Sequence, residues 1–211
     1  MRRGSRIDRP RASRFEPGRC PGIAGFRDNS FTATVRIMEF YAWTRGLHRL
    51  YDKAVAAYRS GDRRADGYFS AAETEFLASV GLRPMHLYDF AEDFCGGGEP
   101  DWDTALLIMA ARRDYFLHVQ NGVPNPAEIT ADDLPGRKAE LGGIPWLPRI
   151  ITKARGFLEG VHCPDIMYCC GGDRHFLKAH DIHPADFLRV VWAAQGDDEK
   201  ILHYVRTVRS P

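Results

Sequence analysis

Apolar residues recur at helical spacing from about residue 40 to the end of the chain. Leu47, Leu50, Ala54 and Ala57 follow the i, i+3, i+7, i+10 order that places side chains on one face of a helix. Gly61 follows this pattern and predicts the end of that helix. The folded part of the chain is therefore expected to begin with an amphipathic helix.

Three further helices are expected before residue 120. Ser70-Ala-Ala-Glu73 forms a capping box that opens the second helix, and Pro84 suits the first turn of the third. A fourth helix is predicted from about Asp101, after the Gly-rich stretch 96–100. On this fourth helix, the charges at 112–114 are expected to lie on a solvated face.

The same order of helices recurs one hundred residues later. Identical residues stand at this offset in Leu47/Leu147, Arg49/Arg149, Lys53/Lys153, Ala54/Ala154, Tyr68/Tyr168, Phe76/Phe176, Leu77/Leu177 and Pro84/Pro184. Most of these positions belong to helices that the periodicity assigns independently, which indicates an internal duplication. In the second copy, Asp173, His183 and the Asp197-Asp198 pair are expected to begin helices as caps.

The predicted fold class is all-α, with two tandem four-helix units and a disordered N-terminal tail. We expect a first copy at 38–120, an irregular connector at 121–144 that is rich in Pro and Gly, and a second copy at 145–208. Units of roughly 65 residues bury only modest cores alone, so the copies are expected to pack on one another with pseudo-twofold symmetry.

Residues 1–37 differ from the rest of the chain in charge. They hold nine arginines against three acidic residues, a net charge of +6, which leaves −5 for residues 38–211 of a chain whose total is +1. Three explanations for this tail stay open: a basic arm for nucleic acid or acidic lipid, an organellar transit segment, or translation that starts at Met38. We prefer the last, because periodic sequence begins directly after Met38.

The composition is that of an ordinary globular protein of 211 residues, with 44% hydrophobic and 27% charged residues. No apolar run approaches the roughly 18 residues of a membrane-spanning helix. Five cysteines without a CxxC pair, and a start without a secretory signal, favour a reducing cytoplasm. The mildly acidic body argues against nucleic-acid binding other than through the tail.

A family resemblance emerges in the second copy. Its motifs are Leu147-Pro-Arg149-Ile150, Asp165-x-x-Tyr168, Asp173-Arg174-x-Phe176-Leu177 and Asp197-Asp198-Glu199-x-Ile201-Leu202, preceded by Asp133-Leu134-Pro-Gly-Arg137. In these motifs the chain resembles a bacterial family named domain of unknown function 5069, over about 130–208. The first copy, 40–118, looks like a divergent relative. The family name implies no reaction and supplies no catalytic residue.

The repeated cations are the first candidate site. Arg49 and Lys53, and again Arg149 and Lys153, are spaced i, i+4 and so share a helix face. Two such pairs could converge on a phosphate or carboxylate, with hydroxyl donors from Tyr68 and Tyr168. Alternatively, each pair meets acidic residues of the opposite copy, such as Asp89, Asp165 or Asp173, and serves the interface.

Sulfur and imidazole groups gather in the second copy. Cys163, Cys169, Cys170 and His175 could bind zinc, although the first copy has no counterparts of the last three. Cys169 or Cys170 beside His175 and Asp173 could also form a nucleophilic set. Buried free cysteines and surface histidines are the simpler interpretation, so no cofactor is expected.

Two functional hypotheses follow. The first is a non-catalytic helical module that binds a protein partner or itself, because no acid–base or nucleophile set has a recognisable spacing. The second is an enzyme or sensor for an anionic metabolite that uses Arg49, Lys53, Arg149 and Lys153. If these four charged groups point into one concavity that lacks carboxylates, the second hypothesis is favoured. If each is paired with Asp or Glu, the first is favoured.

Overall fold

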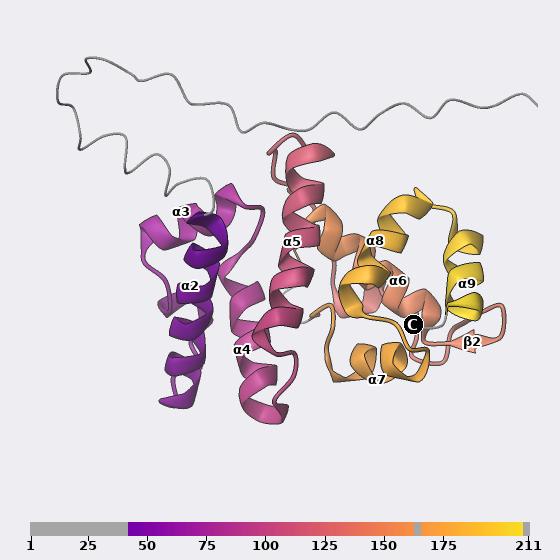
Figure 1. Ribbon diagram of the computed structural model, residues 1–211, viewed down its shortest axis with the longest axis horizontal. Coiled ribbons are helices and arrows are strands. Elements are labelled where there is room, and N and C mark those ends of the chain that lie inside the picture. The colour runs from indigo at the N-terminus through magenta and orange to yellow at the C-terminus, as the bar shows by residue number, and fades with distance from the viewer. Residues whose placement is uncertain (1–41, 163–165, 209–211) are drawn as a thin grey trace, which may run out of the picture. The chain divides into compact units, whose positions relative to one another are not determined.

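The computed structural model describes residues 42–162 and 166–208, and in these ranges it confirms the all-α class (Figure 1). The eight α-helices of the described residues are α2 (Ala42–Arg59), α3 (Ala71–Ser79), α4 (Pro84–Gly97), α5 (Trp102–His118), α6 (Leu147–Glu159), α7 (Gly171–Ala179), α8 (Pro184–Ala194) and α9 (Asp198–Thr207). The prediction of a disordered tail at 1–37, with Met38 as the start, lies outside the described residues, as does Cys163.

Most of the predicted helix starts are correct. Ser70 and Glu73 form both hydrogen bonds of the capping box before α3, and Asp101 accepts from the Thr104 amide before α5. His183 caps α8 through a bond from the Ala185 amide. The prediction for Asp173 is wrong, because α7 begins at Gly171 after Cys170 and places Asp173 at its third position.

The helix bounds repeat at the predicted offset. The helices α3 and α7 span 71–79 and 171–179, α4 and α8 begin at 84 and 184, and α2 and α6 end at 59 and 159. Residues identical at this offset are buried at both positions in Leu47/Leu147, Ala54/Ala154, Tyr68/Tyr168 and Leu77/Leu177. The helices thus follow the predicted spacing, and the duplication itself stays a prediction.

Helix α5 connects the two predicted copies. In the first copy α2 packs along α4, and in the second α6 packs along α8. Helix α5 contacts α2 and also lies against both α6 and α8, which places it between the two sets in Figure 1. One apolar core joins side chains from both sets, among them Phe90, Ile108, Leu147 and Phe187.

The end of α6 is capped by side chains from the first copy. Polar groups donate to three successive carbonyls there: Arg112 to Leu158 at 2.7 Å, Gln120 to Glu159 at 2.8 Å and Arg83 to Gly160 at 3.2 Å. Cationic donors suit this position because unpaired carbonyls and the helix dipole make a helix C-terminus negative. The expectation that Arg112 lies on a solvated face is therefore wrong, since only 2% of it is exposed.

The connector contains short regular elements that the sequence did not predict. A 3₁₀ turn spans Ala131–Asp133, and β1 (Glu140–Leu141) pairs antiparallel with β2 (Ile144–Pro145). Leu141 stands opposite Ile144 in this hairpin. Its turn uses Gly142 and Gly143, both with positive φ, so two glycines adopt the left-handed backbone that other residues avoid.

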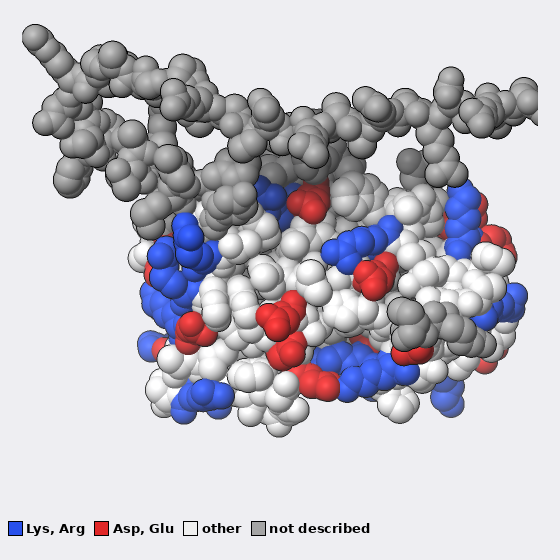
Figure 2. All heavy atoms as spheres, viewed as in Figure 1, with Lys and Arg blue, Asp and Glu red and all other residues white. Residues whose placement is uncertain are grey.

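The surface of the described residues carries both signs of charge. Lys and Arg side chains alternate with Asp and Glu over the face drawn in Figure 2. No helix in the described ranges has the length and apolar character needed to cross a membrane.

Candidate functional site

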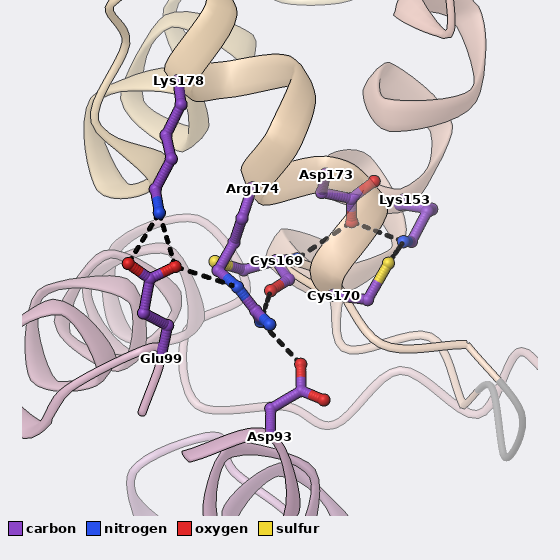
Figure 3. A network of polar contacts seen from close by, with 8 residues as sticks. All are labelled: Asp93, Glu99, Lys153, Cys169, Cys170, Asp173, Arg174 and Lys178. Atoms are coloured by element: carbon purple, nitrogen blue, oxygen red, sulfur yellow. Dashed lines mark hydrogen bonds and ion pairs between the residues drawn. The ribbon is translucent and has the colours of Figure 1, made fainter. Parts of the chain in front are cut away.

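Asp173 is the centre of a buried polar cluster in the second copy (Figure 3). Its carboxylate forms an ion pair with Lys153 and accepts a hydrogen bond at 3.0 Å from the Cys169 amide and another at 3.0 Å from the Trp146 indole. The Lys153 ammonium also lies 3.1 Å from the Cys170 sulfur. Asp173 is fully buried, so these donors replace the water that a buried carboxylate loses.

The cluster fixes two residues with a left-handed backbone. Trp146 and Cys169 both have φ near +69°, a conformation that costs a residue with a Cβ about 1–2 kcal/mol. Trp146 also needs space at Gly172, where an added Cβ would lie 2.7 Å from the indole ring. The carboxylate of Asp173 therefore positions the backbone and the ring that lead into α6 and α7.

The equivalent pair of the first copy is exposed. Lys53 forms an ion pair with Glu73 at 2.6 Å, and both side chains retain substantial contact with solvent. Lys53 and Lys153 thus meet carboxylates within their own copies. The alternative in which each cation pairs with an acid of the opposite copy is wrong for both lysines.

A groove lined by residues of α4 and α6 contains part of the predicted anion site. We call it the α4–α6 groove and define it by its lining residues, which are Met85, Tyr88, Asp89, Glu92, Asp93, Arg137, Trp146, Arg149, Lys153, Ile166, Met167 and Cys170. Residues of the first copy form one wall, and α6 together with the segments before α6 and α7 contributes the other. Two of the four predicted cations, Arg149 and Lys153, are part of this groove.

Arg149 is half-buried and donates through Nη1 to the Pro135 carbonyl at 2.8 Å. Its guanidinium lies 5.7 Å from the centre of the Trp146 ring, and the structure gives it no carboxylate partner among the described residues. Arg137 is exposed and likewise has no ion pair there. The groove therefore presents two guanidinium groups with free donors.

Arg49 and Lys53 do not contribute to this groove. Arg49 is exposed on α2, and neither residue lines the groove that Arg149 and Lys153 share. Tyr68 and Tyr168 are buried, and their hydroxyls donate to the carbonyls of Asp62 and Pro184. The described residues thus do not bring the six predicted anion ligands together.

Asp89 faces the same groove from α4 and was not predicted to be a ligand. Burial raises the pKa of its carboxyl to about 7, and the neighbouring charges of Glu92 and Asp93 add to this effect. No hydrogen bond or ion pair to Asp89 exists among the described residues. A partly buried carboxyl without a partner, in a groove that Arg137 and Arg149 also line, is typical of a binding site.

A small cavity of about 40 Å³ adjoins the groove, because Met85, Asp89 and Lys153 line both. His86 also lines it and accepts at Nδ1 from the Arg83 amide. Burial lowers the pKa of His86 to about 3, helped by the positive charges of Arg112, Arg83 and His162. The imidazole is therefore neutral over the physiological pH range.

A second charged network joins the two copies at the start of α7 (Figure 3). Arg174 donates to Asp93 at 2.6 Å and to the Cys169 carbonyl at 2.7 Å. Glu99 accepts two bonds of 2.6 Å from Lys178 and lies 3.7 Å from Arg174. These pairs hold α7 beside the end of α4, and they leave Asp93 engaged rather than free for a ligand.

The proposed sulfur and imidazole ligands are spread out. Cys169 is buried, Cys170 contacts Lys153, and His175 is exposed on α7. Over the ranges 42–162 and 166–208, no three His, Cys, Asp or Glu side chains are grouped as metal ligands. The zinc hypothesis stays untested, because Cys163 falls outside those ranges.

The sequence reasoning missed Asp89 because its neighbours come from another copy. Asp89 was considered only as a possible partner of the lysines, and Arg137 only as part of a family motif. Neither residue belongs to the repeat at an offset of one hundred residues. Asp89 corresponds to Arg189, and Arg137 corresponds to Ile37. The available signal in the sequence was the position of Asp89 between the apolar residues Leu87 and Phe90 of α4.

Comparison with family models gives a match in the last part of the chain. The family model described as Domain of unknown function (DUF5069) matches residues 133–211, which confirms the resemblance predicted for the second copy. The divergent resemblance predicted for the first copy stays a prediction. No curated protein and no solved structure matches the chain.

Proposed function

We propose that this protein is a binding module for a small metabolite with an anionic group, which it holds in the α4–α6 groove. Arg149 and Arg137 would be the cationic contacts, in place of the four-residue set that the sequence predicted. The observation that carries the proposal is a groove between the copies with two guanidiniums that have no carboxylate partner among the described residues. Guanidinium groups bind carboxylates and phosphates through paired hydrogen bonds.

Lys153 has a supporting role in this proposal. Its charge is balanced by Asp173, so it contributes little net attraction for an anion. It holds Asp173 in place, and Asp173 in turn holds the indole of Trp146, against which Arg149 lies. The cluster thereby positions the arginine that would meet the ligand.

Association with a protein partner is the weaker alternative. The large apolar side chains that are exposed in the described residues are Leu107, Val119 and Val123. Scattered exposed apolar residues are common on monomeric proteins and do not by themselves indicate an interface. The groove offers a more specific arrangement of groups.

Thermal unfolding of the full chain tests the proposal with inorganic phosphate, citrate, succinate and adenosine monophosphate. An anion at about one hundred times its dissociation constant adds about 2.7 kcal/mol, which raises the midpoint by several degrees in a chain of this size. We expect at least one such shift, lost in Arg149→Gln and reduced in Arg137→Gln.

Arg49→Gln is the matched control, because Arg49 occupies the equivalent position on α2 and does not line the groove. The shift should persist in this variant. A shift lost equally in Arg49→Gln and Arg149→Gln would contradict the proposal.

A further inference from the structure

Asp89 is distinguished by its lack of a partner from the two acidic residues beside it on α4. Glu92 accepts a hydrogen bond of 3.1 Å from the Tyr58 hydroxyl, and Asp93 accepts one of 2.6 Å from Arg174. Asp89 lines both the groove and the adjoining cavity without such a bond among the described residues. Its oxygens are therefore available to a ligand.

The surroundings of Asp89 favour a positive group. Tyr88 and Trp146 line the groove with aromatic rings, which attract cations to their faces. Met85 and Met167 add polarisable thioethers. Carboxylate and aromatic rings together are a suitable lining for an ammonium group.

Electrostatics point in the same direction. The pKa of Asp89 is raised to about 7, first by burial and then by the negative charges of Glu92 and Asp93. A cation bound at Asp89 would stabilise the ionised carboxylate against each of these effects. The α4 wall of the groove is thus acidic, whereas Arg137 and Arg149 make the other side basic.

We infer that the ligand of the α4–α6 groove is zwitterionic, with an ammonium group bound by Asp89 and an acidic group bound by Arg149 and Arg137. Free amino acids and ω-amino acids are the simplest members of this class. The inference rests on the proposed function, because it assumes that the groove binds a small molecule. It adds a second recognition element, of opposite charge, on the opposite wall.

Isothermal titration calorimetry on the full chain tests the inference with sets of three probes. Each set holds an amino acid, the acid that lacks its amine, and the amine that lacks its carboxylate, for example 4-aminobutanoate, butanoate and butylamine, together with α-amino acids of similar length. We expect at least one amino acid to bind about tenfold or more tightly than either of its halves, since each charged hydrogen bond adds to affinity.

Variants assign the two ends of the ligand. Asp89→Asn should abolish the preference for the amino acid over the acid that lacks the amine, while binding through Arg149 persists. Glu75→Gln is the control, because Glu75 is exposed on α3 and lines neither the groove nor the cavity, and it should retain the preference. Unchanged selectivity in Asp89→Asn would overturn the inference.

The pH dependence gives an independent readout. An ammonium group binds the ionised form of Asp89, so affinity for the amino acid should rise about tenfold between pH 6 and pH 8 for a group with a pKa near 7. The acid without the amine should lack this rise, and Asp89→Asn should remove it. Other charged or titratable groups around Asp89 are Arg83, His86, Tyr88, Glu92, Asp93, Arg137, Arg149, Lys153, His162, Tyr168 and Cys170.

The failures of the two proposals can be told apart. Anions that bind through Arg149 with no benefit from an amine would overturn the zwitterionic ligand and leave the proposed function standing. Absence of binding by every amino acid tested would also overturn the zwitterionic ligand. Absence of binding by every anion and every amino acid would overturn both.

Discussion

Lys153 and Asp173 form a buried ion pair at positions one hundred residues beyond Lys53 and Glu73, which form an exposed one. A lysine–carboxylate pair thus joins α2 to α3 at the surface and joins α6 to α7 in the interior. Because solvent screens the exposed charges and not the buried ones, the two pairs are expected to differ greatly in their effect on stability.

Replacement of each lysine should show how much its ion pair contributes to the free energy of unfolding. Lys153→Met leaves the Asp173 carboxylate buried without its counter-charge, so the free energy of unfolding should fall by about 3–5 kcal/mol. Lys53→Met should change it by less than about 1 kcal/mol. Urea denaturation of both variants measures the difference, and Lys153→Met/Asp173→Asn should recover part of the loss. Equal losses for the two lysine variants would refute this interpretation.

Asp89 should make the protein less stable as the pH rises. Its folded pKa of about 7 lies above the ordinary 3.8, so between pH 4 and 7 the folded state holds a proton that the unfolded state has released. The cost is absent below about pH 4 and complete above pH 7. Asp89→Asn should therefore be more stable than the wild type at pH 8, by on the order of 4 kcal/mol for a pKa raised from 3.8 to about 7, and similar at pH 4.

His86 should have the opposite effect in an overlapping range. Its folded pKa of about 3 lies below the ordinary 6.5, so between pH 3 and 6.5 only the unfolded state gains a proton. Stability therefore falls as the pH drops through this range. His86→Asn, which keeps an acceptor for the Arg83 amide, should flatten that fall.

From pH 4 to 6.5 the two contributions oppose each other, because each group gives a slope of about 1.4 kcal/mol per pH unit with the opposite sign. Denaturation curves across this range should show slopes that change in opposite directions in the two variants. If the slope of stability against pH changed in the same direction in both variants, the opposite pKa shifts of Asp89 and His86 would be contradicted.

The close approach of Arg112 to Gly160, at the end of α6, can be tested by alanine substitutions of two glycines. Gly160 and Gly98 both end helices with φ near +70°, so each Gly→Ala change carries a similar backbone cost. Only at Gly160 would the new Cβ collide with a neighbour, lying 2.2 Å from Arg112 Nη2, whereas Gly98 has nothing within 4 Å. Thermal unfolding should show a loss for Gly160→Ala at least about 1 kcal/mol larger than for Gly98→Ala. Similar losses would mean that Arg112 moves aside at no cost.

The adjacent cysteines should differ in reactivity. Burial raises the pKa of the Cys169 thiol to about 12, and this residue has no exposed surface. Cys170 is partly exposed, lines the groove, and contacts the Lys153 ammonium. With 5,5′-dithiobis(2-nitrobenzoate) under native conditions, mass spectrometry of peptides should find Cys170 modified at least tenfold faster than Cys169. A faster reaction at Cys169 would show that α7 opens at its start.

The helices could be predicted from the sequence because their signals are local. The capping box at Ser70 and Glu73, Pro84 at a helix start and the apolar spacing around Leu47 each act within one or two turns. Arg112 shows where such reasoning stops. A charged side chain is expected to be exposed to solvent. Arg112 is buried because it donates to a carbonyl at the end of α6, which is distant in the sequence.

The candidate site was predicted in part. Arg149 and Lys153 were chosen by their repetition, and both line the groove. Lys53 shares that repetition, but it forms the exposed pair with Glu73 and does not line the groove. Asp89 and Arg137 carry no repeated pattern. Their relation to the groove depends on how the copies pack, which spacing along one chain does not encode.

The capping of α6 has an evolutionary consequence. The segment that matches the family begins at residue 133, yet the side chains that complete α6, from Arg83, Arg112 and Gln120, precede it. Any descendant that lost the earlier helices would have to acquire a new set of donors for the same carbonyls. Selection for a stable α6 is therefore expected to keep the two halves together in inheritance, whatever ligand the groove binds.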